Sequence, residues 1–203
     1  MLPSSSHFAL EATGVATVLR LHSEDGTNRL TRACVLAVTE AIHQLAVSPA
    51  PLAITGNHRF FSAGADLAEI AALTAPDAFR FSQMGQALMN ALEQFPAPVY
   101  AAIEGYCMGG GLDLALACHR RIASPHSVFG HRGAALGLIT GWGGTQRLPR
   151  LIGKGRALQI LLAAEKIPAN VALRIGLVDA VADDPLRAAL VRIKGTAPHI
   201  SSR

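Results

Sequence analysis

The sequence contains few of the residues that characterise several large classes of protein. Cysteine occurs only three times among 203 residues, at the widely spaced positions Cys34, Cys107 and Cys118. This pattern favours buried, reduced thiols over disulfides or a metal site, and it predicts a cytoplasmic protein. The first residues, MLPSSSHFALEATG, lack a basic region followed by an apolar core, so no secretory signal is expected.

Charged and aromatic residues are also scarce, at 16% and 5% of the chain, while hydrophobic residues make up 50%. No uncharged run reaches the ~18 residues that a membrane span needs, so no membrane association is expected. The formal net charge is +4, but lysine and arginine are scattered and form no long basic run. Nucleic acid is therefore not the expected partner, whereas a phosphate-bearing small ligand suits this mild excess of positive charge.

Extended and helical patterns alternate along the chain. Alternating or continuous apolar residues predict strands at 15–21, 52–55, 99–103, 121–123, 128–130 and 177–181. Apolar residues at helical spacing predict a helix that starts near Thr31, and further helices at 77–92, after the glycine run at 109–111, and at 144–151, 156–164, 170–175 and 185–194. This alternation predicts an α/β fold, and without a repeat or linker we expect one domain over residues 1–203.

Two loops rich in small residues follow predicted strands. The first, FFSAGADL at 60–67, lets the backbone turn sharply with its N–H groups directed outward. The second, EGYCMGGGLD at 104–113, opens a helix whose N-terminus favours negative charge. Either loop alone fits an ordinary turn. The G-x-G-x-x-G and G-x-x-x-x-G-K-[ST] motifs are absent, and Ser62 lacks the flanking glycines of a nucleophile elbow.

Three ordered segments together carry a family resemblance. They are ITGNHRFFSAGADL, PVYAAIEGYCMGGGLDLALACHRRIAS and FGHRGAALGLITGWGGTQRLPRLIG, and RIGLVDAV follows near the end. Over about residues 15–193 the chain resembles the enoyl-CoA hydratase/isomerase (crotonase) superfamily. The resemblance implies a crotonase-like (ClpP/crotonase) spiral of repeated ββα units, with a shortened C-terminal region that lacks the family's trimerisation helices after about residue 195.

The same resemblance implies a ligand and a set of site residues. The partner would be an acyl-CoA thioester bound by a homo-oligomer, a trimer or a dimer of trimers, with no separate cofactor and no metal. The backbone N–H groups of Ala65 and Gly110 would form an oxyanion hole for the thioester enolate, each worth about 3–4 kcal/mol. Substrate-binding positions would be Asn28, Leu30, Ala63, Gly64, Asp66, Leu67, Gly109, Gly133, Thr140 and Gly141. Asp66 equally suits a helix N-cap.

The acid/base positions depart from the family pattern. Where hydratases of the family carry their first glutamate, this sequence has Asp113, whose shorter side chain sets its carboxylate ~1.5 Å further back, a displacement worth ~100-fold in rate. Asp113 is either the remaining acid/base or an acid favoured by the helix dipole. The second glutamate position is Gly133, which cannot exchange a proton. His131 either replaces that glutamate, if the segment is extended, or occupies an edge position seen as glutamine in relatives.

Three further residues have structural interpretations. Trp142 either packs against the acyl group or covers a helix junction, and core packing is the favoured reading. His119, where the family typically has an aspartate, is expected to be structural. Cys107 is expected to be a small buried hydrophobe rather than a nucleophile.

The function that follows is an acyl-CoA enzyme, an enoyl-CoA hydratase-like lyase of fatty acid metabolism. With one displaced carboxylate, only weak addition of water to a 2-enoyl-CoA is expected. One alternative keeps the oxyanion hole for decarboxylation, thioester hydrolysis or isomerisation of another acyl-CoA. Another is a non-catalytic acyl-CoA-binding paralogue.

Overall fold

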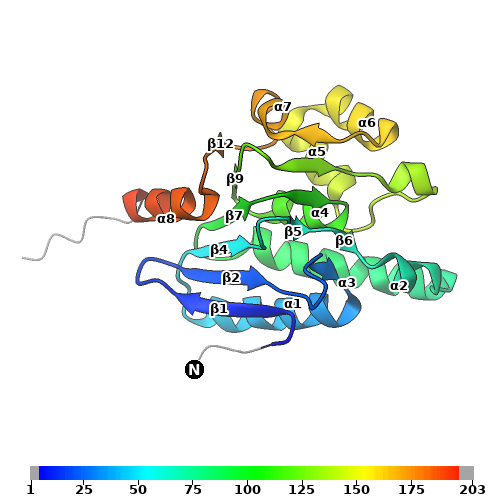
Figure 1. The fold of residues 1–203 in the computed structure, drawn as a ribbon. Helices are drawn as coiled ribbons and strands as arrows, with labels where there is room; N and C mark the ends of the chain where they lie inside the picture. The colour runs from blue at the N-terminus through cyan, green and yellow to red at the C-terminus, as the bar shows by residue number, and fades with distance from the viewer. Residues whose placement is uncertain (1–4, 197–203) are drawn as a thin grey trace, which may run out of the picture.

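The central element of the fold is a six-stranded sheet ordered β1-β2-β4-β7-β9-β12 (Figure 1). The computed structural model describes residues 5–196. The first strand pairs antiparallel with the second, and every later pair is parallel. The strands are β1 (Phe8–Ala12), β2 (Thr17–Leu21), β4 (Leu52–Thr55), β7 (Val99–Ile103), β9 (Arg120–Ala123) and β12 (Ala180–Val181).

A smaller sheet is ordered β11-β10-β8-β5, and three of its strands follow strands of the large sheet along the chain. In the chain, β4, β7 and β9 lead into β5, β8 and β10 respectively, and helices come after each pair. The smaller strands are β5 (Phe60–Ser62), β8 (Tyr106–Met108), β10 (Val128–Gly130) and β11 (Ile167–Pro168), and a separate pair joins β3 (Arg29–Leu30) to β6 (Gly64–Ala65). The repeated strand–strand–helix order agrees with the expected ββα spiral.

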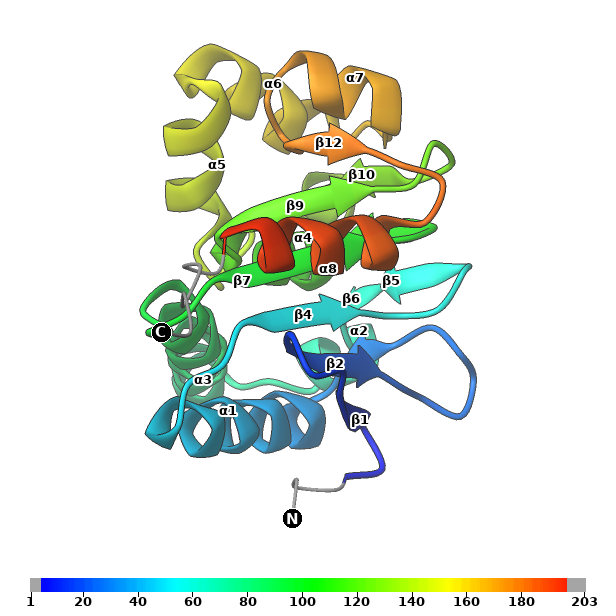
Figure 2. The ribbon, with the colours of Figure 1, turned by 90° about the vertical axis from the view of Figure 1, so that its left-hand side faces the viewer.

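Helices cover both faces of the large sheet. The helix α8 crosses one face, against β4, β7 and β9 (Figure 2). On the opposite face, the strands pack into the core that they share with α1 (Arg32–Val47), α3 (Ala75–Glu93) and α4 (Gly110–Ala117). The other helices are α2 (Leu67–Ala71), η1 (Gly133–Leu136), α5 (Gly144–Ile152), α6 (Lys154–Ala163), α7 (Ala169–Arg174) and α8 (Pro185–Thr196). None of the helices in the described part of the chain is both long and apolar enough to cross a membrane.

Side chains of β7 alternate between two apolar clusters. Val99, Ala101 and Ile103 belong to the main core beneath α1, α3 and α4. Tyr100 and Ala102 point the other way and join the cluster under α8. Because successive residues of a strand face opposite sides of a sheet, a strand covered on both faces is apolar throughout, as this one is.

The predicted helices and the longer strands are confirmed, with shifts at their ends. The helix predicted at 77–92 is α3, which starts at Ala75 because the Thr74 side chain caps it by accepting from the Asp77 N–H at 3.4 Å. The strand predicted at 177–181 shrinks to β12, because the N–H groups of Leu177 and Val178 bond to the Ala172 carbonyl in a turn.

His119 has the structural role expected of it. Its Nδ1 accepts from the Val99 N–H at 2.9 Å, and its Nε2 lies 3.1 Å from the Glu93 carbonyl oxygen. The ring thus joins the start of β7 to the last turn of α3.

Arg121 is a buried cation that ties the end of α4 to the edge of the large sheet. Its side chain donates to the carbonyl oxygens of Cys118 at 2.7 Å and Leu177 at 2.9 Å, and it lies 3.4 Å from the Asp179 carboxylate. Desolvation lowers the pKa of Arg121, and the negative charge of Asp179 opposes that effect. The contacts hold α4 at its C-terminal end, opposite the end that faces the site.

The three cysteines are free and buried, as predicted. Burial raises the pKa of the Cys34 and Cys118 thiols from 9.0 to about 12, and it raises that of Cys107 well above its usual value. The reactive species, the thiolate, is therefore depleted in the folded protein.

Thiol labelling tests this depletion. At pH 8 we expect all three cysteines of the native protein to react with iodoacetamide about 1,000-fold more slowly than in 6 M guanidinium chloride, from the thiolate fraction alone. Mass spectrometry of timed samples measures the rates. Rapid labelling of Cys107 in the native state would contradict its place as a buried, inert side chain.

Candidate active site

A cavity of about 700 Å³ opens between α2, α3, the turn before α4, the 131–142 segment and α6. Eleven of the residues that the sequence singled out contribute to its wall: Ala63, Ala65, Leu67, Gly109, Gly110, Asp113, His131, Gly133, Thr140, Gly141 and Trp142. The two loops proposed from the sequence therefore meet at one site.

The 62–65 loop and the turn before α4 approach each other closely at their backbones. Gly64 has φ +93°, and a Cβ there would lie 2.5 Å from the Met108 carbonyl oxygen and 2.9 Å from the Gly110 nitrogen. Gly64 itself lies beneath the cavity wall. Ser62 fixes the loop, because its hydroxyl accepts from the Gly64 N–H at 3.0 Å. This close packing sets the Ala65 nitrogen beside Gly110, 3.2 Å from where a Cβ on Gly110 would be.

Asn28 and Leu30 support this loop from behind and do not form the cavity wall. The Asn28 side-chain amide donates to the Phe60 carbonyl at 2.9 Å, and the Asn28 backbone carbonyl accepts from the Ser62 hydroxyl at 2.7 Å. Leu30 is fully buried in the core, and its backbone pairs with Ala65. Asn28 and Leu30, which were expected at the edge of the ligand site, therefore support the loop that forms part of the site.

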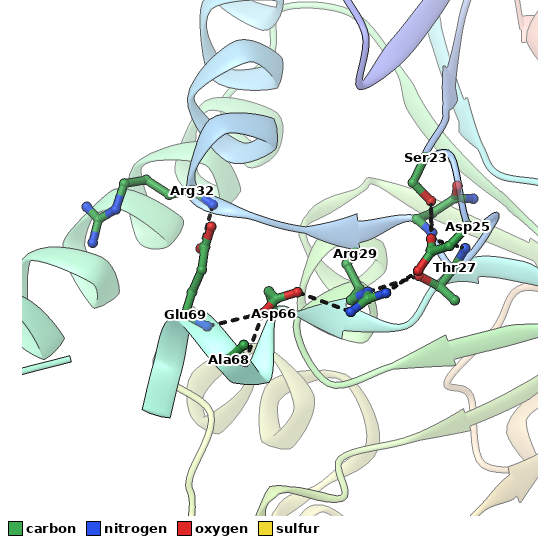
Figure 3. A network of polar contacts seen from close by, with 9 residues as sticks. Ser23, Asp25, Thr27, Arg29, Arg32, Asp66, Ala68 and Glu69 are labelled. Atoms are coloured by element: carbon green, nitrogen blue, oxygen red, sulfur yellow. Dashed lines mark hydrogen bonds and ion pairs between the residues drawn. The ribbon is translucent and has the colours of Figure 1, made fainter. Parts of the chain in front are cut away.

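Asp66 caps α2 and is not part of the cavity wall, which confirms the N-cap interpretation (Figure 3). Its carboxylate accepts from the N–H groups of Ala68 at 2.8 Å and Glu69 at 3.1 Å, and Arg29 lies 3.3 Å away. The hydrogen bond from Glu69 is the largest influence that lowers the pKa of Asp66. Glu69 in turn accepts from the Arg32 N–H at 2.8 Å, so α2 is anchored to the start of α1.

Asp113 and His131 form a buried pair at the inner end of the cavity. Asp113 lies in the first turn of α4 and is 2% exposed, and His131 is 4% exposed. The Thr140 hydroxyl donates to one carboxylate oxygen of Asp113, Oδ2. The other oxygen, Oδ1, lies 3.2 Å from Nε2 of His131. That separation is within hydrogen-bonding range, yet the angles are poor, so both atoms lack a hydrogen-bond partner among the described residues.

The environment of Gly133 decides whether His131 can replace an acid at that position along an extended strand. That alternative required residues 131–133 to be extended, but β10 ends at Gly130 and a 3₁₀ helix begins at Gly133. A Cβ on Gly133 would lie 2.9 Å from the Leu138 carbonyl oxygen. The Leu138 N–H also bonds to the Gly133 carbonyl at 2.9 Å, so the turn closes over this position. His131 instead lines the cavity beside Asp113.

Trp142 both packs in the core and lines the cavity. Its Nε1 donates to the Phe81 carbonyl at 3.2 Å, and the two rings are 5.2 Å apart. The indole lies against Gly85 of α3 and Gly110 of α4, where a Cβ would collide with it. The core packing favoured from the sequence is confirmed, and contact of Trp142 with an acyl group stays a prediction.

Most of the apolar wall was not predicted. It comes from scattered positions on α2, α3, β8, η1, α6 and the turns between them, which no motif in the sequence joins. These residues are Ile70, Leu73, Ala78, Phe81, Met108, Ala134, Leu136, Leu161 and Leu162. Over residues 5–196, no group of three His, Cys, Asp or Glu side chains is arranged to hold a metal ion.

Comparison with known proteins agrees with this architecture. The enoyl-CoA hydratase/isomerase family model matches residues 11–193. The chain is 40% identical over 175 residues to the crotonyl-CoA hydratase of Syntrophomonas wolfei, a match that covers 85% of this chain and 67% of that protein. It is 46% identical over 132 residues to a probable enoyl-CoA hydratase of Bacillus subtilis, covering 64% of this chain and 51% of that protein.

Solved structures show the same fold. The Pseudomonas aeruginosa protein DspI superposes with a TM-score of 0.90 at 34% identity, over 95% of this chain and 75% of that one. The enoyl-CoA hydratase of Bacillus anthracis gives a TM-score of 0.88 at 32% identity, over 93% and 76%. The chain belongs to the enoyl-CoA hydratase/isomerase (crotonase) family and has the crotonase fold. It spans from a half to three quarters of the length of these four proteins.

Proposed function

We propose that this protein binds an acyl-CoA thioester in the cavity and adds water to the double bond of a 2-enoyl-CoA. The thioester oxygen is held by the backbone N–H groups of Ala65 and Gly110. The oxygen of a water molecule bonds to C3 while its proton passes to Asp113. The electron pair of the double bond moves onto the thioester as an enolate, and a proton is then added at C2.

The observation that carries this proposal is the meeting of two backbone loops beside a buried carboxylate. Gly110 is the first residue of α4, so its N–H has no acceptor within the helix. Ala65 lies next to it across the Gly64 contact, and Asp113 is one helical turn further along. Backbone donors at a helix N-terminus stabilise negative charge where it develops, and a buried carboxylate exchanges protons nearby.

The direct test is turnover of crotonyl-CoA and longer 2-enoyl-CoAs by the purified protein. The loss of absorbance of the conjugated thioester measures the rate. We expect measurable hydration to the 3-hydroxyacyl-CoA. A panel of saturated, malonyl-type and 3-enoyl-CoAs, analysed by mass spectrometry, tests decarboxylation, thioester hydrolysis and isomerisation. Turnover only on that panel would replace hydration by another acyl-CoA reaction. Calorimetric binding of acyl-CoA with no turnover would indicate a non-catalytic paralogue.

We further propose that the protein acts as a homo-oligomer in acyl-CoA metabolism. Apolar side chains stand exposed around the cavity mouth, with Leu67 at 55%, Leu136 at 58%, Ile139 at 78% and Leu162 at 68% exposure. Such a patch favours contact with another apolar surface. Light scattering coupled to size-exclusion chromatography measures the assembly.

A further inference from the structure

The buried Asp113–His131 pair leaves two polar atoms without a hydrogen bond. Neither Oδ1 of Asp113 nor Nε2 of His131 has another partner among residues 5–196. An unsatisfied buried polar group costs about 1–3 kcal/mol, more if charged. The cost is not required by packing, because an apolar residue would fill the same space without it. Unsatisfied groups of this kind are typical of sites that complete their contacts only with a ligand.

Among the described residues, His131 is also the one basic group within ion-pair distance of Asp113. No lysine or arginine of the described residues forms an ion pair with this carboxylate, whereas Nε2 of His131 lies 3.2 Å from it. A buried carboxylate is stable in its ionised form only when a cation or hydrogen bonds compensate it. A proton on the ring supplies that compensation and makes the pair neutral overall.

We propose, on the basis of the hydration proposed above, that His131 is a second catalytic residue and delivers the proton to C2. Both side chains line the cavity, and Nε2 faces Asp113, which leaves Nδ1 as the nitrogen that exchanges a proton with the substrate. The pair starts with Asp113 ionised and His131 protonated. Asp113 as base and His131 as acid thus take the place of the carboxyl group that is absent at Gly133.

The protons and electrons balance over one cycle. Water gives its proton to Asp113 and its hydroxyl to C3, and the double-bond electrons form the enolate. The Nδ1–H proton of His131 then bonds to C2, and the enolate electrons form that new C–H bond. After the product leaves, solvent water carries the proton of Asp113 back to His131. The net change is the addition of one water molecule.

Gly144 holds the pair in place. A Cβ at Gly144 would collide with Oδ1 of Asp113 and would lie 2.9 Å from Nε2 of His131. Because Gly144 has no side chain, both unpartnered atoms can lie close to its backbone. The Thr140 hydroxyl, which donates to Oδ2, also fixes the carboxylate, and Oδ1 is the oxygen that lies beside the ring.

The test is His131→Gln, which restores the amide expected at an edge position and keeps a similar volume. We expect hydration of crotonyl-CoA to fall about 100-fold, while butyryl-CoA binding measured by calorimetry stays within about threefold. The exchange of the C2 protons of butyryl-CoA in D₂O, followed by mass spectrometry, should fall by a similar factor. Exchange starts from the product form of the pair, with the proton on Asp113 and Nδ1 of His131 free to take a proton from C2. It involves no attack by water, so it isolates the step assigned to His131.

Two controls keep the outcome interpretable. His126→Gln makes the same change at an exposed loop histidine and should leave both rates within about twofold, as expected of a surface substitution. His131→Ala should regain part of its exchange activity with added imidazole, which a purely structural role would not allow. If the wild type is active and His131→Gln matches it, the inference fails alone. If the wild type neither hydrates nor exchanges any acyl-CoA, the proposed function fails first.

Discussion

Asp113→Asn is expected to lower the kcat for hydration of crotonyl-CoA about 1,000-fold, within the range seen when a general base is removed. Asparagine keeps the shape of the side chain and an oxygen for the Thr140 hydroxyl, so the loop that ends at Thr140 stays in place. What is lost is the charge that accepts a proton from water. Initial rates at saturating substrate measure the effect, and calorimetry with a saturated acyl-CoA verifies that binding persists.

Asp184→Asn is the matched control for this substitution. Asp184 is an exposed carboxylate before α8, on the face of the sheet away from the cavity, and it accepts from the Arg187 N–H at 2.8 Å. Asparagine caps a helix about as well as aspartate, so stability and activity should be unchanged. Equal turnover by Asp113→Asn and the wild type would remove Asp113 from the mechanism.

Gly110→Ala is expected to lower kcat/KM about 100- to 1,000-fold, as the loss of an oxyanion-hole donor does elsewhere. A methyl group at this position would lie 2.6 Å from the ring of Trp142 and 3.2 Å from the Ala65 nitrogen. The indole cannot move away easily, because its Nε1–H donates to the Phe81 carbonyl and the Phe81 ring packs against it. The start of α4 must move instead, which separates the two proposed donors.

Gly155→Ala provides the comparison for that change. Gly155 lies in α6 with nothing within 4 Å of an added methyl group. The substitution should stabilise the helix by up to about 1 kcal/mol and leave turnover unaltered. Thermal unfolding of both variants separates a local change at the hole from general destabilisation. An active Gly110→Ala enzyme with a normal KM would show that this turn does not hold the thioester oxygen.

The elements that the sequence predicts well are those with a clear period or a strong cap. The helix from Thr31 and the fully apolar strand β7 belong to this group, because one cap or one uninterrupted run decides them. The short strands β5, β8 and β11 have two or three residues each and exist only because neighbouring segments align beside them. The sequence of a short segment does not predict which other segments will lie beside it.

The same distinction applies to the site. The loops around Ala65 and Gly110 are local in sequence, so a resemblance in motifs located them, and the cavity places both in its wall. The contact between Asp113 and His131 joins α4 to the end of β10. Neither segment has a sequence pattern that indicates a contact with the other. Asp66 was ambiguous in the sequence because a capping acid and a ligand-binding acid precede a helix in the same way.

The turn that closes over Gly133 bears on how such a site can be redesigned. The Leu138 carbonyl fills the space that any side chain at position 133 needs, so Gly133→Glu introduces a backbone collision before it introduces an acid. Position 133 can therefore carry a side chain only if the turn around Leu138 shifts. An engineered acid at this position needs a matching change in the turn, so the two segments have to be redesigned together.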